Sequence, residues 1–158
     1  MAFLKSFQLD AFQSDIMQSG EYLTSASAFV FSGRQKFLET TFIDIDLYLG
    51  LWKGSLSFNT DTILSDISSY ELINSEYTRI KISKANWILD KLENSVYLNT
   101  AVLFNPITEN WGVIGGYFIS TSADNTGKLI NIESFTGNPI NITQGLYFSV
   151  EPKFKVFG

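Results

Sequence analysis

VYLNTAVLFNPITENWGVIGGYFISTSADNTGKLINIESF, residues 96–135, is the stretch around which the rest of the chain is organised. Asn105-Pro106 and the run Ser122–Gly127 interrupt its apolar character, and Pro, Asn, Asp and Gly each favour turns. Between these interruptions lie three segments with a strand-like composition, at 96–104, 113–119 and 129–135. The pattern predicts an antiparallel meander that forms half of a compact β core.

The middle segment of this meander carries two informative features. Gly115-Gly116 would weaken an isolated strand, so the pair indicates a close backbone approach, a bulge or a bend. Trp111 stands where the strand enters the core. This position predicts that the indole packs inside the protein and does not stack on a ligand.

Composition indicates a single globular domain with a strong preference for β structure. The chain has 158 residues, of which 45% are hydrophobic and 15% aromatic, including 14 Phe. Only 17% are charged, which leaves two interpretations open. Partners cover part of the surface, or the core is well packed and uses many Phe.

Charge and residue usage exclude several classes of site. The net charge is −5, and the densest basic group, Arg79-Lys81-Lys84, is too small for a nucleic-acid patch. Without Cys or His, the chain can form no disulfide, thiolate site, imidazole–metal site or His-dependent triad. It also has no apolar run long enough to span a bilayer and no convincing signal peptide. We therefore expect synthesis in a cytoplasm, with neither a membrane nor a nucleic acid as partner.

Residues 1–41 form a leader of mixed character. Asp10 could cap a short helix over Ala11–Gln18 that Gly20 ends. Leu23–Phe31 reads as a strand or an extended arm, and Gln35–Thr41 as another short helix. The leader is either an irregular cover over the core or, in the interpretation favoured here, an arm that docks on a neighbour.

Further strands follow the leader. Phe42–Trp52 alternates clearly at its start, Tyr77–Ile82 alternates throughout, and Leu146–Val150 places Leu146, Phe148 and Val150 inward. The polar loop 53–76 is either an interface element or an ordinary surface loop with one short helix near Ser69–Ile73. The apolar residues Phe154, Val156 and Phe157 predict a buried C-terminus. We expect about seven or eight strands in an all-β fold, an antiparallel β-sandwich or jelly-roll-like barrel over residues 42–158.

Three groups of residues are candidate sites. Asp44 and Asp46 share one side of the predicted strand and could bind a divalent cation, but a solvated face is favoured. The aromatic and cationic face of Tyr77, Arg79 and Lys81 could bind a glycan, and again a solvated face is favoured. Asp124–Gly127 reads as a hairpin turn. We therefore predict no catalytic, cofactor-binding or metal-binding residue.

Sequence motifs of common enzymes are absent. The chain contains no nucleophile elbow, no phosphate-binding glycine-lysine loop and no dinucleotide fingerprint. The sequence does not exclude a carboxylate pair for glycoside hydrolysis, because a chain with 16 acidic residues always contains some possible pair. We therefore expect a protein that is not an enzyme.

A series of short motifs, in order, resembles a family of small tailed-phage virion proteins. The resemblance covers about residues 47–150 and rests on LYLGL (47–51), YTRI (77–80), NTAVLFNP (99–106), WGVIGGYF (111–118), SADNTGKL (122–129) and INITQGLYF (140–148). The chain departs from the family pattern at Gly115-Gly116, where polar residues are usual, and in its longer leader.

The resemblance implies a structural role in the virion of a bacteriophage. The leading hypothesis is a capsid decoration (cement) protein that clamps neighbouring capsid subunits, with the major capsid protein or another virion protein as partner. Closed symmetric oligomers are common among structural proteins, and a homotrimer would fit decoration or fibre proteins on three-fold axes. The alternatives are a tail or fibre component, a glycan-binding module that uses Tyr77 and Arg79, and an enzyme that uses Asp44 and Asp46.

Overall fold

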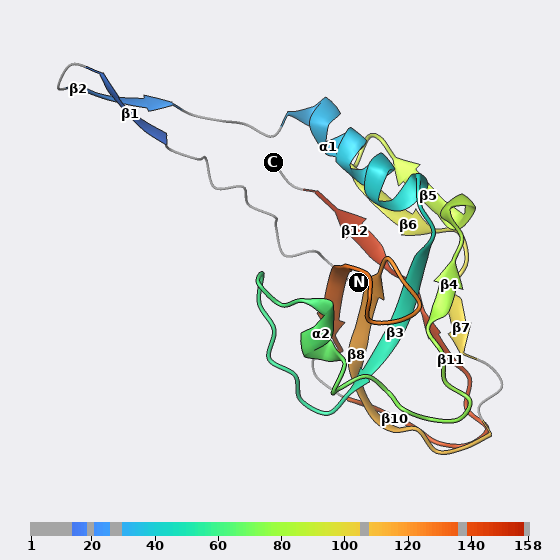
Figure 1. The fold of residues 1–158 in the computed structure, drawn as a ribbon. Helices are drawn as coiled ribbons and strands as arrows, with labels where there is room; N and C mark the ends of the chain where they lie inside the picture. Colours follow the sequence, from blue (N-terminus) through green and yellow to red (C-terminus); the bar gives the residue numbers. More distant parts are fainter. Residues whose placement is uncertain (1–13, 19–20, 26–29, 105–107, 136–138, 157–158) are drawn as a thin grey trace.

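The structure is a computed structural model that describes residues 14–18, 21–25, 30–104, 108–135 and 139–156. Strands dominate it, and the helical segments are few (Figure 1). The helical segments are α1 (Phe31–Leu38), the π-helical turn η1 (Glu39–Ile43), α2 (Leu64–Ile67) and the 3₁₀ turn η2 (Lys84–Asn86). The strands are β1 (Ser14–Gln18), β2 (Glu21–Ser25), β3 (Leu47–Lys53), β4 (Ile80–Ile82), β5 (Trp87–Asp90), β6 (Ser95–Leu98), β7 (Val102–Phe104), β8 (Gly112–Ser120), β9 (Leu129–Ser134), β10 (Ile140–Ile142), β11 (Phe148–Val150) and β12 (Lys153–Lys155).

Strand β8 is the centre of the largest sheet. It pairs with β3 along one edge, while β9 and β10 share its other edge, and β4 adds to the far side of β3. Three smaller sheets join β1 to β2, β7 to β11, and β5 and β12 to β6. Every pairing between these strands is antiparallel. The predicted antiparallel, mostly β fold is thus confirmed.

The predicted meander is only half correct. Strands β8 and β9 form the expected hairpin around the turn at 121–128. The segment 96–104, in contrast, is interrupted at 99–101 and divides into β6 and β7. Neither pairs with β8, because β6 lies between β5 and β12 while β7 pairs with β11. The backbone bends at 99–100, where the N–H of Asn99 donates to the backbone carbonyl of Asn86. After this bend the chain leaves the sheet of β6 and enters the sheet of β7.

The strand predicted over Phe42–Trp52 begins later, at Leu47. Phe42 and Ile43 instead belong to η1, which continues α1 without a break. Leu38 and Phe42 are four positions apart and both are buried, which is the spacing of one face of a helix. The strand-like alternation at 43–47 was therefore misleading.

Other predicted boundaries also change. The helix expected over Ala11–Gln18 is wrong for its described part, since Ser14–Gln18 is strand β1. Of the strand or arm expected over Leu23–Phe31, residues 23–25 belong to β2 and Phe31 starts α1, while 26–29 lie outside the described residues. The helix over Gln35–Thr41 is confirmed as part of α1 and η1.

Three further predictions need correction in detail. The short helix of the 53–76 loop is α2 at Leu64–Ile67, where the Asp66 carboxylate accepts the Ile63 N–H at 2.9 Å. Strand β4 covers only the last residues of Tyr77–Ile82. Strand β11 starts at Phe148, and Leu146 is 48% exposed, so it does not face inward.

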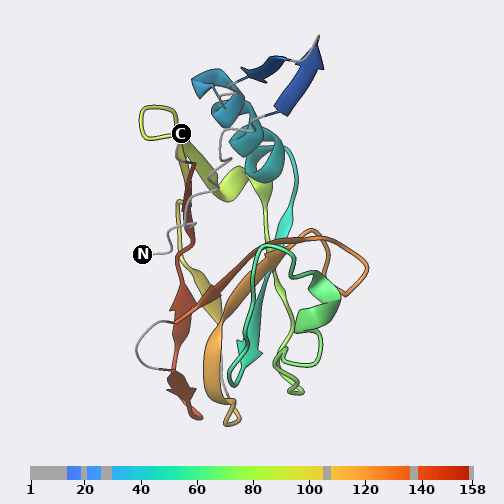
Figure 2. The same ribbon diagram turned by 90° about the vertical axis from the view of Figure 1, so that its left-hand side faces the viewer.

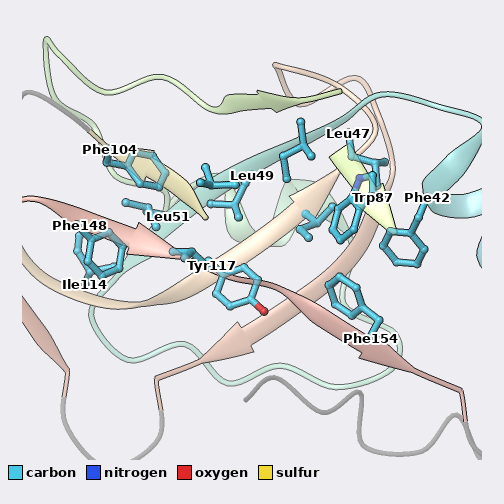
Figure 3. Close-up of a cluster of buried hydrophobic side chains, with 14 of the residues drawn as sticks. Phe42, Leu47, Leu49, Leu51, Trp87, Phe104, Ile114, Tyr117, Phe148 and Phe154 are labelled. Atoms are coloured by element: carbon cyan, nitrogen blue, oxygen red, sulfur yellow. The ribbon is translucent and has the colours of Figure 1, made fainter. Parts of the chain in front are cut away.

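The core combines aliphatic side chains, such as Leu47, Leu49 and Leu51, with a set of aromatic rings that pack on one another (Figure 3). Phe42 stacks on Phe154 with ring centroids 4.8 Å apart, and its edge meets Trp87 at 5.0 Å. These contacts join η1 to β12 and β5. Phe154 and Val156 are buried, which confirms the predicted burial at the C-terminal end for its described residues, while Phe157 lies outside them. Trp111 is also buried and packs against Phe104, as predicted.

Gly115-Gly116 marks a close approach, as the sequence predicts. A Cβ on Gly116 would lie 1.9 Å from the carbonyl oxygen of Glu133, and a Cβ on Gly115 would lie 2.2 Å from the Trp52 ring. The register between β3 and β8 also shifts at Trp52/Lys53. The glycines therefore allow the Trp52 indole to lie flat across β8.

Candidate functional site

The most extensive polar cluster surrounds Arg79, just before β4. Its side chain is 3% exposed, and its guanidinium meets the Glu71 carboxylate in a two-point contact. The Arg79 Nε donates to Glu71 Oε1 at 2.8 Å, and Nη2 donates to Oε2 at 2.7 Å. This paired geometry matches the planar fork of a guanidinium to the two carboxylate oxygens.

The remaining donors of Arg79 bind the turn that joins β8 to β9. Nη1 donates to the carbonyl of Ser122 at 3.2 Å and to that of Asp124, and Nη2 donates to Asn125 Oδ1 at 2.5 Å. The guanidinium also lies 4.9 Å above the centre of the Phe118 ring. Since every N–H of this side chain has a partner within the protein, it has no donor left for a ligand.

Tyr77 extends the same cluster toward the core. Its hydroxyl donates to Glu71 Oε1 at 3.0 Å and accepts the Leu51 N–H at 2.8 Å. Burial and the neighbouring Glu71 carboxylate raise the pKa of the Tyr77 phenol, so it stays neutral. The arrangement clamps the loop before β4, strand β3 and the β8–β9 turn together, which is a structural role.

The face of Tyr77, Arg79 and Lys81, considered as an alternative glycan site, therefore does not form one exposed surface. Only Lys81 is exposed, while Arg79 is buried and Tyr77 packs against the core. The prediction of a solvated face fails for the same two residues. Their partners come from Glu71 and from residues 120–125, which local alternation does not reveal.

The two carboxylates weighed for a cation do not form a pair on a strand. Asp44 is exposed at the end of η1. Asp46 pairs with Lys81 at 2.8 Å and accepts the Lys84 N–H, and the bond to Lys81 lowers the pKa of its carboxyl. Within the described ranges, no group of three or more acidic residues is placed to hold a metal ion.

The turn predicted at Asp124–Gly127 is confirmed. Asp124 Oδ1 accepts the Thr126 N–H at 2.9 Å and its hydroxyl at 2.6 Å, and these bonds lower the pKa of the Asp124 carboxyl. The Ser122 hydroxyl accepts the Gly127 N–H at 2.9 Å. The local bonds close the turn and present the carbonyls that Arg79 binds.

A second carboxylate, Glu133 on β9, lies in a partly buried setting. The Tyr117 hydroxyl donates to Glu133 Oε2 at 2.9 Å, and the Trp52 indole donates to the Glu133 carbonyl at 3.2 Å. Burial raises the pKa of the Glu133 carboxyl above its ordinary value of 4.5, although the Tyr117 bond opposes the rise. Sequence reasoning did not single out this residue, because its setting depends on the register of β8 and β9.

Two open surface concavities accompany these clusters. One of about 500 Å³ includes Lys53, Tyr70, Glu71, Ile73 and Val113 in its lining. The other, of about 630 Å³, lies between the ends of β6 and β12. Each contains a single carboxylate, and in the first that carboxylate is already held by Arg79. Neither concavity therefore brings two carboxylates together.

The feature that most suggests an interface is the β1–β2 hairpin. Its strands pair in register from Ser14↔Ser25 to Gln18↔Glu21 and pair with no other described strand. Both views show the hairpin apart from the other three sheets, at the end of the molecule where α1 lies (Figure 1 and Figure 2). A two-stranded hairpin is at best marginally stable by itself in water, so a projecting one needs a neighbour.

Comparisons with protein-family models, curated proteins and solved structures find no match to the chain. Among the described residues, no helix has the length and apolar character needed to cross a membrane.

Proposed function

We propose that the protein is a structural subunit of a tailed-phage virion, most specifically a decoration protein that reinforces the capsid surface by clamping neighbouring subunits. The finer architecture we propose is a β-sandwich or jelly-roll-like body with an N-terminal arm. We choose the virion as the assembly because the chain carries motifs that resemble those of small virion proteins, from LYLGL at 47–51 to INITQGLYF at 140–148.

The projecting hairpin is the observation that carries the proposal. The ribbon pairs with no other described strand, so two of its edges are open among the described residues, and open strand edges recruit other chains. The polar clusters at Arg79 and Glu133 are occupied by internal bonds, so the most available recognition element is this arm. An arm on a rigid β body suits a subunit that links neighbours.

Electron cryo-microscopy of the native particle, with mass-spectrometric copy counting against the major capsid protein, tests the assignment. A decoration protein is expected in hundreds of copies on a regular shell lattice. A chain lacking residues 1–25 should not decorate bare capsids, whereas the full chain should. Decoration by the truncated chain would contradict the role of the arm, and absence from every particle would contradict the virion role.

A tail or fibre component is the second candidate, because the same resemblance covers both kinds of virion protein. The copy number separates the two. A dozen copies or fewer, confined to one vertex or to the tail, would assign the protein to the tail or fibre and leave the arm as its attachment element.

A further inference from the structure

We propose that the β1–β2 hairpin of one copy docks on the exposed face of α1 in a second copy. The inference rests on the proposed function only in assuming that the protein acts as an assembly subunit. It names the neighbour of the arm, which is another copy of this chain. Its test uses purified protein without any particle, so it can fail while the virion role stands.

The α1 helix offers an apolar surface beside the arm. Val30, at the N-cap, is 60% exposed and Phe31 is 47% exposed, and the body buries only Leu38 of the whole helix. A helix normally buries a broad apolar stripe, so exposure of these residues indicates a surface that a partner covers. The turn after β5 adjoins this surface, since Gln35 Nε2 donates to the Lys91 carbonyl at 3.0 Å, and Leu92 in that turn is 91% exposed.

Arg34 supplies a polar anchor within this surface. Its guanidinium lies 5.9 Å from the centre of the Phe31 ring, and its Nε is buried with no hydrogen-bond partner among the described residues. A buried donor without a partner is costly, so the Arg34 guanidinium is not fully satisfied by the described residues. The nearby Glu39 carboxylate contacts Lys36 and Lys91, at 3.9 and 4.0 Å.

The hairpin complements this helix in charge and in apolar content. Residues 14–25 contain Asp15 and Glu21 and no Lys or Arg, whereas α1 contains Arg34 and Lys36 and no acidic residue. The register opposes Ile16 to Leu23 and Met17 to Tyr22, and consecutive positions of a strand belong to opposite faces. The register therefore pairs apolar residues of the two strands with each other, which fits a hairpin that is covered by another surface.

Charge reversal tests this docking in solution. The hairpin variant is Asp15→Lys/Glu21→Lys, and the helix variant is Arg34→Glu/Lys36→Glu. Sedimentation velocity would follow association of the full chain, with Lys84→Glu as an exposed control. We expect wild type and control to associate equally, and each reversed variant to weaken association at least about tenfold. Higher salt should weaken wild-type association, because exposed charges are screened.

Mixing the two reversed variants identifies the docked chain. In a mixture, each hairpin meets a helix of opposite charge on the other variant, so association is expected to return. A mixture that stays monomeric, while a single chain with all four substitutions regains the wild-type thermal midpoint, would show docking within one chain and overturn the proposal. So would a wild type that is monomeric at all concentrations. Val30→Ser, which keeps every charge, should also weaken association, and its melting curve verifies that the body is folded.

Discussion

At the scale of single residues, Arg79 holds three parts of the chain together. Replacing Arg79 with Met would leave the Glu71 carboxylate, 15% exposed, without its counter-ion, and would free the carbonyls of the β8–β9 turn. Breaking a buried pair on one side typically costs about 3–5 kcal/mol. We expect Arg79→Met to lower the free energy of unfolding by roughly that amount, measured by urea denaturation.

Lys81, on the same segment of chain, provides the matched control. Its ion pair with Asp46 is exposed, so Lys81→Met should cost far less than Arg79→Met. The double variant Glu71→Leu/Arg79→Met should recover part of the loss, because it removes both charges. Equal losses for Arg79→Met and Lys81→Met would show that the buried pair does not stabilise the fold.

Glu133 predicts a pH dependence of stability. The folded state holds the pKa of this carboxyl above its ordinary value of 4.5. The raised pKa of Glu133 therefore adds to the free energy of unfolding in full below about pH 4.5. This stabilisation is lost as the pH rises through the folded-state pKa. Asp46 and Asp124 act oppositely, since their lowered pKa values remove stability only as the pH falls below about 3.8.

Glu133→Gln keeps an acceptor for the Tyr117 hydroxyl and removes the titration. We expect urea midpoints of the wild type to fall between about pH 4.5 and pH 7 by more than those of Glu133→Gln. A wild type and a variant with parallel pH profiles would contradict the burial effect at this carboxylate.

The residues of the polar clusters show why a sequence predicts only part of this site. The exposed position of Lys81 and the turn at Asp124–Gly127 follow from local patterns, and the structure has both. Arg79 occupies the same alternation as Lys81, yet it is buried by partners that lie 8 to 46 positions away in the chain. Local periodicity contains no information about such partners.

At the scale of an element, β8 depends on glycines where it crosses Trp52. A Cβ on Gly116 would collide with a backbone carbonyl, which cannot swing aside. Overpacking of this kind typically costs about 1–3 kcal/mol. We expect Gly116→Ala to lower the free energy of unfolding by about 2 kcal/mol or more, measured by chemical denaturation.

Gly50 on β3 supplies a contrasting case. The nearest atoms to a Cβ there all belong to the Phe118 ring, at 2.2 to 2.9 Å. A smaller side chain at 118 should therefore relieve Gly50→Ala, so Phe118→Leu should recover part of its cost in a double-mutant cycle. The same Phe118→Leu substitution should not rescue Gly116→Ala. Rescue of both glycine variants would contradict the separate origins of the two clashes.

Helices and strands were predicted correctly where residues close in the sequence decide the structure. The β8–β9 hairpin follows from its turn residues and two strong apolar runs. Residues 96–104 divide into β6 and β7 because their partners, β12 and β11, come from the end of the chain. The sequence around Phe42 fits a strand or a helix equally well. Leu38, about one helical turn earlier, is also buried, and this spacing favours the helix.

At the scale of the whole molecule, the arm and the body should be thermally independent. The hairpin strands pair only with each other among the described residues, whereas Leu38 lies in the core. Deletion of residues 1–25 should leave the thermal midpoint of the isolated body within a few degrees of that of the full chain, measured at a concentration where both are monomeric. A deletion extended through Leu38 should lower it clearly, since large-to-small core changes typically cost about 2–5 kcal/mol.

The antiparallel, mostly β class was predictable at this scale. The division of the strands among four sheets was not, because β8 is shared by β3, β9 and β10 through contacts that no local pattern encodes. The pairing of β1 with β2 as a hairpin was not predictable either. Its two short strands carry no clean period.

The direct passage from α1 through η1 toward β3 has a mechanical consequence. A pull on the arm would travel along the helix, past the anchored side chains of Leu38 and Phe42, and arrive at β3, which is hydrogen-bonded on both edges. Ladder bonds lie perpendicular to the strands, so tension along β3 strains many of them at once in shear instead of opening them one by one. The arm is thus joined, through α1 and η1, to a strand that resists tension in shear.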